Sequence, residues 1–159
     1  MTLRENIDKI LEKFVAALMA ILVVDVLWQV ISRYVLSAPS SFTDELAGFL
    51  LIWVGLFGSA YVAGKNEHLA IDLLVQRSGP ARRKFLEIFI SLCIIIFSLT
   101  VLVVGGSWLV YTRFALDVKS AALEIPLGYV YIVLPISGLL IMFFTADNLS
   151  KFLKAHKEN

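Results

Sequence analysis

The chain has 159 residues, of which 59% are hydrophobic and 17% are charged, and its formal net charge is +1. A soluble domain of this size would carry more charge, and a nearly neutral chain gives no reason to expect a nucleic-acid partner. The composition therefore predicts a single membrane domain over residues 1–159, because its apolar runs approach the roughly 20 residues that cross a hydrocarbon core of about 30 Å.

The first third of the chain predicts an amphipathic segment followed by two membrane spans. Residues 1–13 place apolar side chains on one helical face and charged ones on the other, so this segment fits the membrane interface. Apolar runs predict spans over residues 14–36 and 46–64. Pro39 breaks the chain between these spans, and Ser41 fits a helix-capping pattern.

The remainder predicts a short interfacial helix and two further spans. Residues 68–77 share an apolar face within a polar stretch, which is typical of a helix lying in the interface. Apolar runs predict spans over residues 85–111 and 126–145. Pro135 lacks a backbone N–H and predicts a kink in the last span. The predicted fold is an all-α integral membrane protein with four transmembrane helices and amphipathic interfacial helices.

Basic residues predict the orientation of these spans. Most of them lie before span one, between spans two and three, and in the C-terminal tail. Only Arg33, Arg113 and Lys119 lie on the other side. Because cytoplasmic loops carry the excess of Lys and Arg, we expect both termini and the middle loop to be cytoplasmic.

Polar residues in span one raise the question of an intramembrane site. Asp25, Gln29 and Arg33 lie on one stripe at spacings of four residues. A lipid-facing carboxylate at the depth of Asp25 costs a few kcal/mol, so it should face protein or water, or be protonated. An interhelical hydrogen bond that fixes packing is favoured over an ion or proton site, because no second acid lies deep in another span.

Two neighbouring acids, Asp44 and Glu45, precede span two. The dipole of a helix favours negative charge at its N-terminus. Arg33 lies at the same end of span one and can pair with either carboxylate. We expect these acids to do no chemistry, but to cap the helix and fix the hairpin of spans one and two.

Small residues mark one face of span two. Gly48, Gly55 and Ser59 share this face at spacings of seven and four residues. Small side chains let another helix approach closely, so the face is predicted to be a packing seam rather than a pore lining. Trp53, within the same span, is interpreted as a helix-packing residue.

Residues with catalytic or metal-binding chemistry are scarce. His68 and His156 lie outside the predicted spans, so no intramembrane pair of histidines is available to hold a haem. His68 and Asp72 are four residues apart and could bind a metal weakly, but a loop histidine is far more often a cap or surface contact. Cys93 is the only cysteine, and no metal or phosphate-binding motif occurs. We expect no enzyme activity, no cofactor, no metal and no substrate site in this chain.

The region from Arg33 to Asp72 resembles the small membrane subunit of tripartite ATP-independent periplasmic (TRAP) transporters. The resemblance rests on Arg33-Tyr34, Phe42-Thr43-Asp44-Glu45, Leu51-Ile52-Trp53, Gly64-Lys65-Asn66-Glu67-His68-Leu69-Ala70-Ile71-Asp72, and Pro126, Tyr129 and Pro135 in the last span. Two positions depart from the pattern: Gly48 stands where members often carry a basic residue, and Glu67 where they often carry glycine.

The resemblance implies a scaffold for a larger partner. Such a subunit pairs with a large multispanning permease subunit that holds the substrate and sodium sites and moves them in an elevator fashion. A periplasmic substrate-binding protein delivers the organic acid, of the sialic acid or C4-dicarboxylate class. This chain would then lie among membrane lipids in the bacterial inner membrane, as a polypeptide separate from the large subunit.

Two other functions stay open from the residues. A stand-alone small proton-coupled transporter would use Asp25, the one mid-membrane carboxylate. A membrane-bound redox subunit is disfavoured, because no histidine pair lies within the predicted spans.

Overall fold

The computed structural model describes residues 3–38, 40–65 and 80–155, and almost all of them are helical. The elements are α1 (Leu3–Tyr34), α2 (Ser41–Lys65), α4 (Pro80–Phe97), the π-helix η1 (Ser98–Gly105), α5 (Gly106–Ala115), α6 (Leu127–Tyr131) and α7 (Val133–Ala155). Four helical stretches are long and apolar enough to cross a membrane: Arg4–Tyr34, Ser41–Lys65, Lys84–Ala115 and Leu127–Lys154. The predicted all-α fold with four membrane-spanning helices is confirmed.

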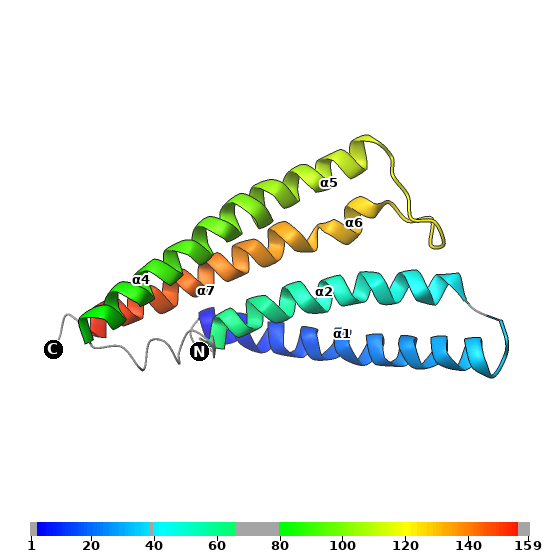
Figure 1. Cartoon of the computed structure of the whole chain (residues 1–159), viewed down its shortest axis with the longest axis horizontal. Coiled ribbons are helices and arrows are strands. Elements are labelled where there is room, and N and C mark those ends of the chain that lie inside the picture. The colour runs from blue at the N-terminus through cyan, green and yellow to red at the C-terminus, as the bar shows by residue number, and fades with distance from the viewer. Residues whose placement is uncertain (1–2, 39, 66–79, 156–159) are drawn as a thin grey trace.

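The four long helical stretches form two antiparallel hairpins (Figure 1). One hairpin consists of α1 and α2, and the other consists of the run α4–η1–α5 packed against α6 and α7. The hairpins meet where α2 contacts α7. We call the end that carries Leu3 and Ala155 the terminal end, and the end that carries the connections 35–40 and 116–126 the distal end.

The buried core lies where α1, α2, η1 and α7 meet. Its members are Leu11, Leu18, Val54, Phe57, Ala60, Ala63, Leu102, Val133, Ile141 and Phe144. Phe14 packs edge-on against Phe57, with ring centroids 5.2 Å apart, and this pair joins α1 to α2. Many other large apolar side chains are exposed on the outer faces of the hairpins, where lipid tails are as apolar as they are.

The helices run further than the predicted spans. The segment predicted at 1–13 continues without a break into span one, since α1 begins at Leu3. The third helical stretch extends past both ends of the predicted 85–111, and the fourth extends beyond 145. Helices continue through polar residues as long as their backbone hydrogen bonds are made, so hydropathy underestimates their length. The predicted interfacial helix at 68–77 lies outside the described residues.

The last span is broken near its proline. The helix is interrupted at Ile132, which separates α6 from α7 just before Pro135. Because Pro135 has no N–H, the carbonyl of Tyr131 one turn earlier loses its helical donor.

Glycines allow the third and fourth helical stretches to approach closely. A Cβ added at Gly138 would lie 2.7 Å from Leu102 Cβ, and one added at Gly106 would lie 2.7 Å from Leu134 Cβ. A Cβ atom is fixed to the backbone, so no side-chain rotation would relieve these contacts. The close seam of this hairpin therefore depends on Gly106 and Gly138.

Candidate functional site

Three polar ties hold the two hairpins together, and the first lies at the terminal end. Arg4 Nη2 donates to the carbonyl oxygen of Gly64 and to Asn148 Oδ1, each at 2.7 Å. Arg4 also forms an ion pair with Asp147 of α7. Asn148 Nδ2 in turn donates to the carbonyl oxygen of Ala63 at 2.9 Å. The last carbonyls of a helix lack partners within it, so these side chains satisfy the end of α2 while they link α1, α2 and α7.

Sequence reasoning missed most of this tie. Arg4 lies among the charged side chains of the predicted amphipathic segment 1–13, and the predicted last span ends at 145, before Asp147 and Asn148. Lys151 Nζ lies 2.7 Å from Asp147 Oδ2, so this carboxylate has two cationic partners. The available signal is an acid and an amide side by side at the end of a long apolar run.

The second tie lies midway along α2. Trp53 Nε1 donates to the carbonyl oxygen of Val130 at 2.9 Å. Val130 lies in α6 just before the helix break, where regular helical hydrogen bonding ends. Trp53 also packs edge-on against Phe57, with ring centroids 5.8 Å apart. Its indole therefore contributes packing to the first hairpin and a hydrogen bond to the second.

The third tie lies at the distal end and depends on Glu45. Its Oε1 accepts from the N–H of Ala121 at 3.0 Å, and its Oε2 accepts from the N–H groups of Ala122 and Leu123 at 2.8 and 2.9 Å. Successive backbone N–H groups that point at one anion form a concave binding site known as a nest. Figure 1 shows the connection between α5 and α6 reaching back to the start of α2. Glu45 therefore fastens this connection to the first hairpin.

The two neighbouring acids have different partners. Asp44 Oδ1 lies 3.4 Å from Arg33 Nη2, and both side chains are about half exposed, so this ion pair stabilises the hairpin little. The expectation that both acids cap α2 is wrong, because Glu45 binds the α5–α6 connection instead. The Ser40 hydroxyl accepts from the Thr43 N–H at 3.4 Å, so Ser40 is the capping residue rather than Ser41.

The predicted stripe on span one does not form a connected network. Asp25 is 8% exposed, and its Oδ2 has no hydrogen-bond partner in the described part of the chain. Gln29 is half-buried, and Arg33 turns to Asp44. The interhelical hydrogen bond expected from Asp25 is thus absent from residues 3–38, 40–65 and 80–155. An ionised carboxylate without a partner is costly to bury, so this group is either protonated or bonded to something outside the described residues.

The small residues of α2 lie on a face that nothing in the described chain covers. Gly48, Gly55 and Ser59 are exposed, and a Cβ added at either glycine would meet no atom within 4 Å. The Ser59 hydroxyl donates to the carbonyl oxygen of Gly55 at 2.7 Å, so it needs no further partner. Ile52, also exposed, lies on the same side of the helix. We call Gly48, Ile52, Gly55 and Ser59 the small-residue face.

The described residues hold no cluster of three or more His, Cys, Asp or Glu side chains that could bind a metal ion. His68 and Asp72 lie outside these residues. What the structure defines is an integral membrane protein made of two tied hairpins, with one unpacked face of small residues along α2.

Comparison with known proteins assigns this architecture to a family. Residues 21–155 match the family described as "Tripartite ATP-independent periplasmic transporters, DctQ component". The match covers most of the chain, so the chain belongs to this family. It is a multi-pass membrane protein of the TRAP small permease type, and the family consists of transporter subunits rather than enzymes.

Relatives agree with this assignment. A Haemophilus influenzae chain whose name describes a TRAP transporter small permease protein is 26% identical over 142 residues, covering 88% of this chain and 85% of that one. The sialic acid TRAP transporter small permease protein SiaQ of Vibrio cholerae is 24% identical over 152 residues, covering 96% and 86%. The sialic acid TRAP transporter permease protein SiaT of Haemophilus influenzae is 28% identical over 115 residues, which cover 72% of this chain and 18% of SiaT.

The terminal tie predicts a loss of stability when Arg4 is changed. Hydrogen bonds to charged groups stabilise by about 1.5–3 kcal/mol, and the partial exposure of Arg4 reduces this, so Arg4→Gln should lower the free energy of unfolding by about 1–3 kcal/mol. Denaturation of the purified protein in mixed micelles measures the change. Lys9→Gln is the control, since Lys9 is exposed and has no ion pair among the described residues. Equal losses in both variants would contradict the role of Arg4.

The distal tie predicts a local opening when Glu45 is neutralised. Glu45→Gln replaces one accepting oxygen by an NH₂ group that faces backbone donors, so the N–H groups of residues 121–123 should exchange severalfold faster with deuterium. Asp44→Asn is the matched control, because it removes only the exposed pair with Arg33 and should leave this exchange unchanged. Hydrogen-exchange mass spectrometry separates the two variants. Unchanged protection in Glu45→Gln would show that the nest does not hold the connection.

Proposed function

We propose that this chain is the small permease subunit of a binding-protein-dependent secondary transporter that imports an organic acid. In this role it is a scaffold for a large permease subunit and does not itself carry the substrate. The observation that supports the proposal is the family match over residues 21–155, on a chain whose only buried charged side chain among the described residues is Asp25. An anionic substrate needs inward-facing cations or hydrogen-bond donors, and the described basic residues lie toward the ends of their helices.

A large partner is supported by the match to SiaT. A segment similar to this chain accounts for only 18% of that protein, so a much longer permease polypeptide contains it. We propose that the small-residue face packs against the large subunit, since Gly and Ser let helices approach closely in a membrane. Because a Cβ at Gly48 or Gly55 would meet nothing within 4 Å among the described residues, the described chain leaves this face open to such a partner.

The proposed location is the bacterial inner membrane, with both termini in the cytoplasm. Leu3 and Ala155, the first and last described residues, lie at one end of the molecule (Figure 1), and so do most of the described basic residues. Arg33, Arg113 and Lys119 are the described basic residues at the distal end. The excess of positive charge at the terminal end supports a cytoplasmic position for that end.

The proposed substrate class is an organic acid such as sialic acid. The names of SiaQ and SiaT support this class, and C4-dicarboxylates are the other class that the family resemblance implies. We assign the sodium coupling to the large subunit, and delivery of the substrate to a periplasmic binding protein.

The scaffold role predicts that filling the small-residue face weakens assembly. Gly55→Leu adds a side chain whose Cβ would meet nothing within 4 Å among the described residues, so the variant should fold normally but copurify poorly with the large subunit. Proteoliposomes holding the large subunit and the binding protein should take up labelled sialic acid, or a labelled C4-dicarboxylate tested in parallel, only when this chain is present. Gly55→Leu should reduce that uptake.

Gly105→Leu provides the matched control, because Gly105 is an exposed glycine of the other hairpin with only an ordinary contact to the Thr100 carbonyl oxygen at 3.5 Å. It should leave assembly and uptake unchanged. Full uptake by the large subunit without this chain would overturn the proposal.

A second candidate function, a stand-alone proton-coupled transporter, rests on the buried and unpartnered carboxyl of Asp25. The Asp25→Asn variant separates the two functions, because the amide keeps the shape of the side chain but cannot exchange a proton. On the scaffold proposal, this variant assembles with the large subunit and supports normal uptake. Lost uptake with intact assembly would favour the second candidate.

A further inference from the structure

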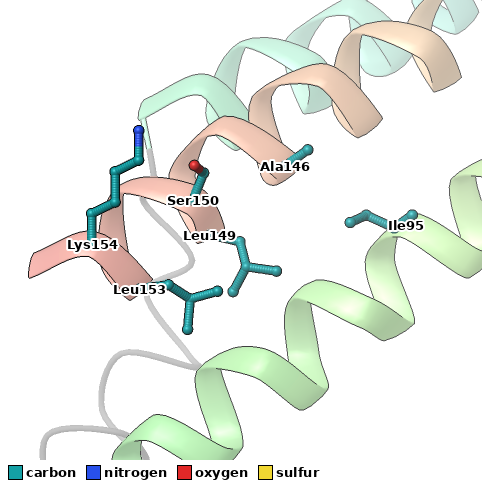
Figure 2. A pocket seen from close by; sticks show the side chains of 6 residues that line it. All are labelled: Ile95, Ala146, Leu149, Ser150, Leu153 and Lys154. Carbon is teal, nitrogen blue, oxygen red and sulfur yellow. The ribbon is translucent and has the colours of Figure 1, made fainter. Parts of the chain in front are cut away.

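An apolar hollow lies between α4 and α7, near the terminal end of the second hairpin. Its volume is about 410 Å³, and it is lined by Ile95 of α4 and by Ala146, Leu149, Ser150, Leu153 and Lys154 of α7. Figure 2 shows Ile95 and Leu149 facing one another across the hollow, with Leu153 and Lys154 toward the end of α7. The hollow belongs to neither the polar ties nor the small-residue face.

The lining determines what the hollow can hold. Most of its wall is hydrocarbon, and a buried water needs two to four polar partners, so water does not fill it well. Leaving it empty would forfeit the dispersion contacts of the lining side chains. A flexible acyl chain meets the requirement, because it supplies carbon contacts and can enter from the surrounding bilayer.

Positive charge gathers at the end where the hollow reaches Lys154. Lys154 lines the hollow, and Figure 2 shows its side chain extending away from Leu149 and Leu153. A long basic side chain of this kind can place its charged head in the headgroup region. Arg82 and Lys84 lie at the start of α4, which Figure 1 shows beside the end of α7. All three side chains are exposed.

These three cations lack a carboxylate partner within the described chain. No ion pair joins Lys154, Arg82 or Lys84 to another described residue, whereas Arg4, Lys65 and Lys151 each have a carboxylate partner. Asp147 is the only acid in α7, and Arg4 and Lys151 already occupy it. Basic pockets between transmembrane helices favour anionic phospholipid headgroups.

We propose that this hollow binds one acyl chain of an anionic phospholipid, with Lys154, Arg82 and Lys84 holding its phosphate headgroup. Because the residues at the end of the hollow are positively charged, we expect it to bind an anionic lipid more tightly than a zwitterionic one. The hollow lies on the second hairpin and the small-residue face on the first, so a lipid here leaves the proposed partner surface free. The inference goes beyond the scaffold role and does not depend on the identity of the substrate.

Photolabelling of the full chain in lipid nanodiscs tests the proposal, both alone and assembled with the large subunit. The probes are phosphatidylglycerol and phosphatidylcholine that carry the same diazirine-labelled acyl chain, and mass spectrometry locates the labelled residues. The phosphatidylglycerol probe should label the walls around Ile95 and Leu149 several times more than the phosphatidylcholine probe does. Excess inorganic phosphate should not compete, because the acyl chain provides the binding that a free anion lacks.

Two pairs of variants sharpen the test. Lys154→Gln should reduce labelling by the anionic probe about fivefold, whereas Lys119→Gln at the distal end should not. Leu149→Trp should fill the hollow and abolish labelling there, whereas Leu139→Trp, at an exposed position of α7 outside the hollow, should preserve it.

Three results would overturn the proposal. Equal labelling by both probes would show that the headgroup is not recognised. Displacement by inorganic phosphate alone would show a simple anion site. Loss of labelling whenever the large subunit is bound would show that protein, rather than lipid, covers the hollow.

Discussion

The whole arrangement depends on how two apolar hairpins are held together in a solvent that is itself apolar. Lipid tails are as apolar as leucine, so burying side chains between helices gives little net drive for association. Polar ties are effective there, because an unpaired backbone or charged group in hydrocarbon is costly. Arg4, Trp53 and Glu45 supply such ties at the terminal end, the middle and the distal end of α2. Each reaches a part of the second hairpin.

The three ties make α2 the central helix and divide its surface. Glu45 and Trp53 of α2 bond to the second hairpin, whereas the small-residue face of Gly48, Ile52, Gly55 and Ser59 is exposed. This arrangement supports the proposed scaffold role, because a unit fixed at three levels is a static support with one face available for packing. A carrier, in contrast, needs a polar site that moves relative to its surroundings.

Local patterns in the sequence predicted the helices, but the ties are non-local. Hydropathy predicted all four spans, because each span is a continuous apolar run. The pairing of Arg33 with Asp44 was also predictable, because only a short connection separates the two residues in the sequence. Glu45 binds backbone N–H groups of residues 121–123. Almost every residue type has a backbone N–H, so this partner could not be predicted from the amino acids at these positions. Small residues likewise indicate a close approach without identifying the neighbour: within the described part of the chain, Gly138 packs against another helix and Gly55 does not.

The two ends of the molecule differ in whether their basic residues have carboxylate partners, as well as in how many basic residues they carry. At the distal end, Arg33 and Lys119 each have a carboxylate partner within 4.0 Å, and Arg113 lies 5.8 Å from the centre of the Tyr131 ring. At the terminal end, Lys154 and Arg82 have no such partner among the described residues. Among the described residues, two of the three distal cations thus have a carboxylate partner, whereas some of the terminal cations have none. In the proposed orientation, with the terminal end in the cytoplasm, the anionic surface potential of that leaflet would act on these unpaired charges and help to hold this end in place.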